Sequence, residues 1–252
     1  ITSELDRTMP DEVLFDAVEM MERLMGTEDV AIYNVVNGDY ARMFSASSKK
    51  ARELGNSIRY KEMSVMYDVL KEHRVFINKS LDPQYPLMAN AIFENEEMQM
   101  IVMLWGLSWE RMTLGQANML VVVSALIQNA VLRAQRYMQT LEENRYSEEG
   151  SRILREDAFK PLVKAYMDAE AKDLAECVFL KIDADPEQYR QIDQLMAKKL
   201  RDSDYLGILP DGKLYALLAN TTKENAGFVQ ERFEQNGYNT EIVEKIAVCP
   251  EE

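Results

Sequence analysis

The second half of the sequence has the most constraining pattern, because short apolar runs alternate there with amphipathic segments in the order strand, helix, hairpin, helix, strand. This order is typical of a ferredoxin-like α/β fold. The strands are expected at 177–182, 205–209, 213–218 and 238–243, the helices between them at 187–200 and 222–235, and a further helix at 151–170. Asn236-Gly237 predicts a left-handed residue at the end of the last helix.

The first half has another order: helix, hairpin, helix, strand pair and long helix. Asn37-Gly38-Asp39 predicts the hairpin, because Asn-Gly readily adopts the positive φ angles of a tight turn. The elements are expected at 11–25, 30–36, 40–46, 61–73, 75–78, 87–94, 98–106 and 113–144. Over roughly residues 8–135 this order resembles a GAF domain, a family of ligand-binding and dimerisation modules. We therefore expect an α/β (α+β) chain with a GAF domain at 1–148 and a ferredoxin-like domain at 149–252, joined by the long helix.

Composition excludes several classes of function. Lys and Arg total 29 against 43 Asp and Glu, and the net charge of -14 disfavours binding to a nucleic-acid polymer. Cys177 and Cys249 are too few for a disulfide framework, which favours a cytoplasmic setting. His73 is the only histidine, so no metal and no cofactor are expected. The apolar stretches 98–109 and 119–132 are shorter than the roughly 20 residues of a membrane-spanning helix.

The segment 200–218 resembles the hairpin of a GGDEF domain. Arg201-Asp202-Ser203-Asp204 matches the inhibitory Arg-x-x-Asp site of that family, five residues before the signature turn. The signature itself is lost, and Lys213 stands where the family has its catalytic acid. Because lysine does not bind divalent metals, the resemblance implies a degenerate GGDEF domain without diguanylate cyclase activity.

A second departure supports this interpretation. Only 184–200 separates Asp183 from Arg201, which is too short for the insertion with which the family recognises its substrate. Asp183 and Asp185 could be metal ligands, but a polar loop after a strand is the preferred interpretation. We expect no enzyme activity.

The resemblance implies that Arg201, Asp204 and Arg232 bind cyclic di-GMP. A guanidinium group can donate two parallel hydrogen bonds to O6 and N7 of guanine, and a carboxylate can accept from the guanine N–H groups. The chain has a second Arg-x-x-Asp, formed by Arg190 and Asp193 in a predicted helix. There the spacing predicts an ordinary salt bridge between residues three apart.

A GAF domain followed by a degenerate GGDEF domain resembles the PelD family of cyclic di-GMP receptors, here in a Gram-positive form. The resemblance implies a receptor that activates Pel exopolysaccharide synthesis and biofilm formation together with membrane and glycosyltransferase components of a synthase complex. It also implies a homodimer at the cytoplasmic face of the cell membrane, with Ile1 following a membrane segment.

Two other functions remain open. The chain could be a scaffold that assembles its partners without a nucleotide, or a GAF sensor whose effector lies among methionines that otherwise fill the core. Those methionines are Met63, Met66, Met98, Met100 and Met103. The long helix 113–144 is expected to join the domains or to pair with its copy in a homodimer, whereas a surface helix is the simpler interpretation.

Overall fold

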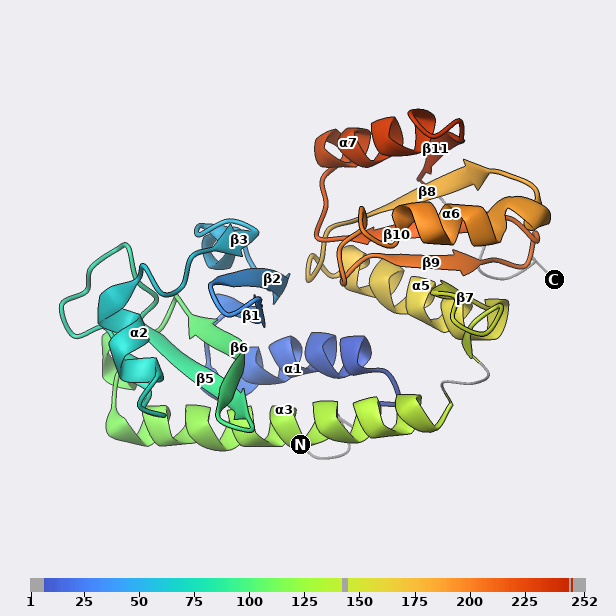
Figure 1. Cartoon of the computed structure of the whole chain (residues 1–252). Helices are drawn as coiled ribbons and strands as arrows, with labels where there is room; N and C mark the ends of the chain where they lie inside the picture. Colours follow the sequence, from blue (N-terminus) through green and yellow to red (C-terminus); the bar gives the residue numbers. More distant parts are fainter. Residues whose placement is uncertain (1–6, 142–144, 245, 247–252) are drawn as a thin grey trace. The chain divides into compact units, whose positions relative to one another are not determined.

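A computed structural model describes residues 7–141, 145–244 and 246 (Figure 1). The chain divides into two compact units, Ile1–Tyr137 (unit 1) and Met138–Glu252 (unit 2). The division lies before the predicted boundary between 148 and 149, inside the long helix. Each unit has its own sheet.

Unit 1 has a six-stranded antiparallel sheet in the order β3-β2-β1-β6-β5-β4. The strands are β1 (Val30–Val36), β2 (Tyr40–Ala46), β3 (Ser57–Ile58), β4 (Phe76–Ile77), β5 (Met88–Glu94) and β6 (Glu97–Leu104). Asn37 and Gly38 both have positive φ angles, which confirms the predicted hairpin between β1 and β2. Asn95 and Glu96 form the same kind of turn between β5 and β6.

The helices of unit 1 are α1 (Pro10–Met25), α2 (Ser64–Leu70) and α3 (Leu114–Thr140). Pro10 suits the first turn of α1, and Gly26 ends the helix in the left-handed conformation, as the sequence predicts. α2 is shorter than the predicted segment 61–73. Figure 1 shows α1 and α3 running along the same side of the sheet.

α3 is the longest helix of the described chain, and the predicted residues 142–144 at its end lie outside the described residues. Gln116 Nε2 donates to the carbonyl of Met25, 2.9 Å away, and Gln128 Nε2 donates to the carbonyl of Phe93. Among the described residues, only α3 is long and apolar enough to cross a membrane by length and composition. A core helix has the same composition, and the bonds of α3 to α1 and β5 fit that role.

Unit 2 has a five-stranded sheet in the order β11-β8-β10-β9-β7. Its strands are β7 (Ile153–Leu154), β8 (Cys177–Asp183), β9 (Tyr205–Ile208), β10 (Leu214–Ala219) and β11 (Asn239–Val243). β11, β8, β10 and β9 are neighbours in this order, and all their pairings are antiparallel. Counted along the chain from β8, they are the fourth, first, third and second strands, which is the ferredoxin-like order that the sequence predicts. β7 pairs in parallel with β9 at the sheet edge.

The helices of unit 2 are α5 (Glu156–Ala171), α6 (Tyr189–Met196) and α7 (Lys223–Glu234). The predicted helix 151–170 is wrong at its start, because Ile153 and Leu154 form β7 instead. α6 and α7 pack on one face of the sheet through Ile192, Ala226 and Phe233. α6 ends at Met196, earlier than predicted, and the loop that follows it carries the candidate site.

Candidate ligand-binding site

Arg201 and Asp204 stand at the two ends of a tight turn between α6 and β9. The backbone N–H of Arg201 donates to Asp204 Oδ2 at 3.0 Å, and the N–H of Asp204 donates to the carbonyl of Arg201 at 3.0 Å. These reciprocal bonds fix the distance between the two residues. The Asp204 side chain is half-buried, whereas the Arg201 side chain is exposed and has no hydrogen-bond partner within the described part of the chain.

Arg232 reaches the same turn from α7. Its Nη1 donates to the carbonyl of Lys199 at 2.7 Å, two residues before Arg201. Asn236 Nδ2 in turn donates to the carbonyl of Arg232 at 2.6 Å and closes the end of the helix. The structure therefore places Arg232 against the segment that leads into the Arg201–Asp204 turn.

A third arginine, which the sequence reasoning missed, supports this loop. Arg152 Nη1 donates to the carbonyl of Ala197 at 3.1 Å, so Arg152 and Arg232 hold carbonyl groups two residues apart in the same segment. The loop itself carries Lys198, Lys199 and Arg201 beside Asp202 and Asp204, so it offers charges of both signs to a ligand.

The second Arg-x-x-Asp differs from the sequence prediction. Asp193 is buried, with 7% of its surface exposed, and accepts a hydrogen bond of 3.0 Å from the backbone N–H of Arg152. The Arg152 guanidinium lies 3.5 Å from the same carboxylate. The predicted salt bridge with Arg190 is wrong, because Asp193 faces inward toward Arg152 while Arg190 is exposed. This copy of the motif is structural.

The hairpin that replaces the GGDEF signature is closed by its own side chains. Tyr215 donates to Asp211 Oδ2 at 2.7 Å, the N–H of Lys213 donates to Oδ1 at 3.0 Å, and Lys181 Nζ lies 3.5 Å from Oδ2. Burial raises the pKa of Asp211, but these three partners outweigh it and place the pKa below its usual value. The Tyr189 hydroxyl donates a hydrogen bond to the carbonyl of Gly212 at 3.0 Å. The only carboxylate of this turn is thus occupied.

Asp183 and Asp185 have local roles. Asp183 ends β8 opposite Asn239 and is exposed. Asp185 and Gln188 form a reciprocal cap of the following short helix, in which the N–H of Asp185 donates to Gln188 Oε1 at 2.9 Å. This fits the interpretation as a polar loop.

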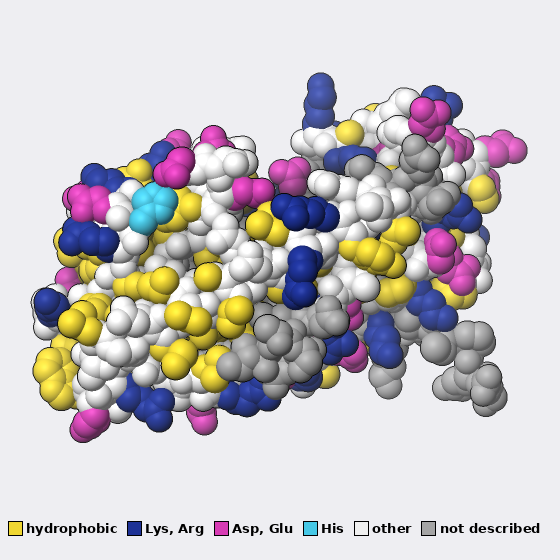
Figure 2. Space-filling model, turned by 90° about the horizontal axis from the view of Figure 1, so that it is seen from below, with side chains coloured by type: hydrophobic (Ala, Val, Ile, Leu, Met, Phe, Trp, Pro, Cys, Tyr) yellow, Lys and Arg dark blue, Asp and Glu magenta, His cyan; other side chains and the backbone are white. Residues whose placement is uncertain are grey.

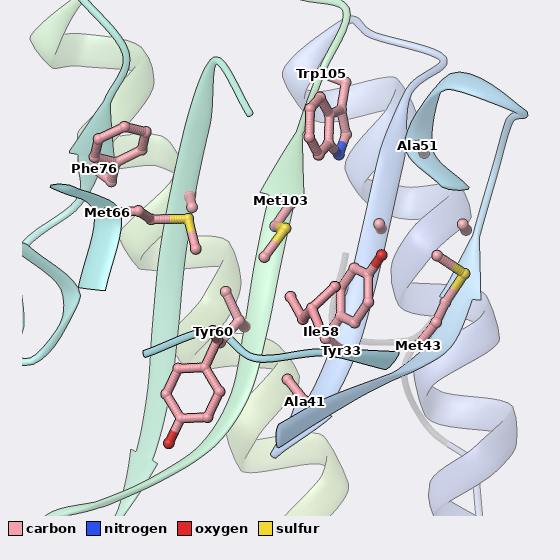
Figure 3. Close-up of a cluster of buried hydrophobic side chains, with 14 of the residues drawn as sticks. Tyr33, Ala41, Met43, Ala51, Ile58, Tyr60, Met66, Phe76, Met103 and Trp105 are labelled. Carbon is pink, nitrogen blue, oxygen red and sulfur yellow. The ribbon is translucent and has the colours of Figure 1, made fainter. Parts of the chain in front are cut away.

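The methionines of unit 1 do not share one surface. Met66 and Met103 lie fully inside a cluster of apolar side chains between the sheet and α2, and Met63 and Met98 pack at its margin (Figure 3). Met100 lies outside this cluster: it alternates with Ile101, and an irregularity in the pairing of β5 with β6 separates it from Met98. The cluster also contains Trp105, whose buried indole N–H has no hydrogen-bond partner in the described structure.

Comparisons with known proteins give only distant likenesses. No family model and no curated protein matches the chain. A solved structure of PelD from Pseudomonas aeruginosa, residue 158 to the C-terminus, shares 11% identity over 96% of this chain and 90% of that chain, with a TM-score of 0.40. PelD residues 156–455 from the same organism, in complex with c-di-GMP, share 12% over 92% of this chain and 81% of that chain, also with a TM-score of 0.40.

A methyl-accepting chemotaxis protein, residues 122 to 287, shares 12% identity over 54% of this chain and 96% of that chain, with a TM-score of 0.44. TM-scores of this size do not support a function, which therefore has to be sought in the side chains of the site.

Proposed function

We propose that the chain is a non-enzymatic receptor that binds cyclic di-GMP at Arg201, Asp204 and Arg232. The supporting observation is the 2.7 Å hydrogen bond from Arg232 to the carbonyl of Lys199, which ties α7 to the turn that holds the other two residues. The exposed Arg232, distant in the sequence, thereby reaches the segment that leads into the turn of Arg201 and the half-buried Asp204.

The chemistry of these groups suits guanine. The exposed Arg201 guanidinium can donate to O6 and N7 of one base, while the Asp204 carboxylate accepts from the N1 and N2 hydrogens. Their backbone bonds preorganise this pair. Arg232 and Lys198 add positive charge for a ligand with two phosphates, in a chain whose net charge of -14 would otherwise repel it.

In this proposal unit 2 is a degenerate GGDEF domain without cyclase activity. Lys213 stands in place of the catalytic acid, and Asp211 is engaged by Tyr215, Lys213 and Lys181. A metal-dependent cyclisation of GTP needs free carboxylates at this turn. The closed hairpin therefore favours a binding protein over an enzyme.

Unit 1 is then a GAF domain, and a homodimer assembles through α3. The chain acts at the cytoplasmic face of the membrane, where ligand binding changes its contacts with membrane and glycosyltransferase components of a polysaccharide synthase and activates Pel exopolysaccharide synthesis and biofilm formation. These parts of the proposal rest on the resemblance of the sequence to the PelD family.

Calorimetry with cyclic di-GMP tests the receptor, with Arg201→Ala as the disrupted variant and Arg190→Ala as the control from the second Arg-x-x-Asp. Arg201→Ala should lose about 2 to 4 kcal/mol, or roughly 30- to 1,000-fold in affinity, because truncation leaves the guanine edge unpaired. Arg190→Ala should bind like the wild type. A wild type that does not bind would contradict the receptor and favour a nucleotide-independent scaffold.

A second candidate function, small-molecule sensing by unit 1, is favoured by the Trp105 indole. It is 4% exposed and its N–H has no partner among the described residues, so an effector with a carbonyl group could accept its hydrogen bond. Native mass spectrometry of the purified protein tests this function. A co-purifying molecule that Trp105→Phe loses would support it, and a mass equal to that of the chain alone would count against it.

A further inference from the structure

Phe228, on α7, is an aromatic side chain that the core of unit 2 does not use. It is 61% exposed, whereas Ala226 and Phe233 on the same helix are completely buried. Among described residues 145–244, no other large apolar side chain is exposed to this extent. Packing within unit 2 therefore gives no reason for a phenylalanine at this position.

Phe228 lies close to Arg232, one of the proposed ligand-binding residues, on the same helix. Residues four apart on a helix lie one above the other on the same side, so Phe228 is a direct neighbour of Arg232. Val229 packs at the margin of the buried cluster, while Arg232 turns to the carbonyl of Lys199. The ring thus stands on the outer side of α7, one helical turn from a guanidinium group that holds the Arg201 turn.

An exposed aromatic ring beside arginines is the usual arrangement for holding a nucleic-acid base. The base stacks on the ring through its π-face, and the guanidinium groups bind its edge or the phosphates. Stacking is tolerant of the base, whereas the hydrogen bonds of an Arg-carboxylate pair are selective for guanine. Stacking on the ring therefore contributes affinity, and hydrogen bonds to the base edge contribute selectivity for guanine.

We propose that Phe228 is a stacking platform for a purine base of the dinucleotide held by Arg201, Asp204 and Arg232. This inference rests on the proposed function and adds a fourth ligand-binding residue. In this site Arg201 and Asp204 select guanine, and Phe228 increases the affinity for any purine that the arginines admit.

Calorimetry with cyclic di-GMP on Phe228→Ala, Phe228→Leu and Phe228→Trp tests this role. Ala and Leu should weaken binding about 5- to 100-fold, because both lose the ring face, and Leu shows that apolar surface alone is not enough. Trp should bind at least as well as the wild type, and its fluorescence should be quenched on titration. Val65→Ala, an equally exposed apolar change in unit 1, should have no effect.

The outcomes separate the two proposals. If the wild type binds and Arg201→Ala does not, but Phe228→Ala and Phe228→Leu bind like the wild type, the platform is wrong and the receptor stands. If the wild type does not bind, both proposals are wrong. Because Phe228 is exposed, the melting temperature of the ligand-free variants should match that of the wild type, which guards against a folding defect.

Discussion

The two units expose apolar side chains in different patterns. The outer side of α3 in unit 1 carries several large ones, and Figure 2 shows apolar side chains gathered on the face of unit 1 that includes α3. They are Leu114, Met119, Val121 and Val122. In unit 2, Phe228 lies one helical turn from Arg232 instead. An apolar row suits another protein surface, whereas an exposed ring next to a guanidinium group suits the planar base of a ligand that also carries phosphates. This contrast is consistent with the proposed function, in which unit 1 assembles the dimer and unit 2 binds the ligand.

The largest expected effect on folding concerns the ion pair that supports the site of unit 2. Arg152→Ala leaves the buried Asp193 with only a backbone partner and frees the carbonyl of Ala197. We expect unit 2 to lose about 2 to 3 kcal/mol of unfolding free energy. In unit 1 the pair of Lys61 with Asp39 is exposed on both sides, so Lys61→Ala should leave the unfolding free energy almost unchanged.

Denaturant unfolding can follow the two units separately. Both tryptophans, Trp105 and Trp109, lie in unit 1, so their fluorescence reports unit 1 while circular dichroism reports the helices of both. Arg152→Ala should lower the denaturant midpoint of unit 2, which circular dichroism detects, and leave the fluorescence transition of unit 1 unchanged. If Arg190→Ala is as destabilising as Arg152→Ala, the assignment of Arg152 as the partner of Asp193 is incorrect.

The next effect tests assembly through α3. In an antiparallel pair of α3 helices centred on Val122, which is 56% exposed, the two Val122 side chains face each other. Val122→Glu buries a like-charge pair at the centre and should weaken dimerisation by at least about 30-fold, or roughly 2 kcal/mol. Sedimentation velocity measures this.

The control for α3 is Val65→Glu, because Val65 is equally exposed but lies on α2. It should leave the sedimentation coefficient of the wild type unchanged. A wild type that sediments as a monomer at every concentration would remove the assembly role of unit 1 and break the contrast between the units.

Local patterns in the sequence predict most of the fold. The turns at Asn37-Gly38 and Asn236-Gly237 are confirmed, because a positive φ angle is a property of one or two residues. β7 was not predicted, since Ile153 and Leu154 are a strand only by pairing with β9, some fifty residues away. A two-residue strand next to a helix has no period of its own, so the sequence pattern predicts one helix over 151–170.

The site follows the same rule. Arg201 and Asp204 form a local turn, and its five-residue spacing to the GGDEF-like hairpin, together with the position of Arg232, distinguishes it from the second Arg-x-x-Asp. Asp193 faces inward and binds Arg152 because of tertiary packing. Local helical spacing predicts a salt bridge with Arg190 instead, and that prediction is wrong. Phe228 could have been found from the sequence only by noticing an aromatic residue on the outer side of a polar helix, four residues before Arg232.

The smallest expected effect concerns the closed hairpin of unit 2 at acidic pH. The folded-state pKa of Asp211 is lowered, although burial opposes this, by Tyr215, Lys213 and Lys181. A carboxyl group with a lowered pKa stabilises the fold above its unfolded pKa of about 3.9, and this contribution is lost as the pH falls through the folded-state value. The melting temperature of the wild type should therefore fall more steeply than that of Asp211→Asn below about pH 4. At pH 7 Asp211→Asn keeps one acceptor oxygen but loses the charge and the second acceptor, so the variant should be somewhat less stable than the wild type, and this difference should shrink below about pH 4. If the melting temperatures of the two proteins fall equally with pH, the charge of Asp211 does not stabilise the hairpin. The inference that this carboxylate is engaged within the fold would then be wrong.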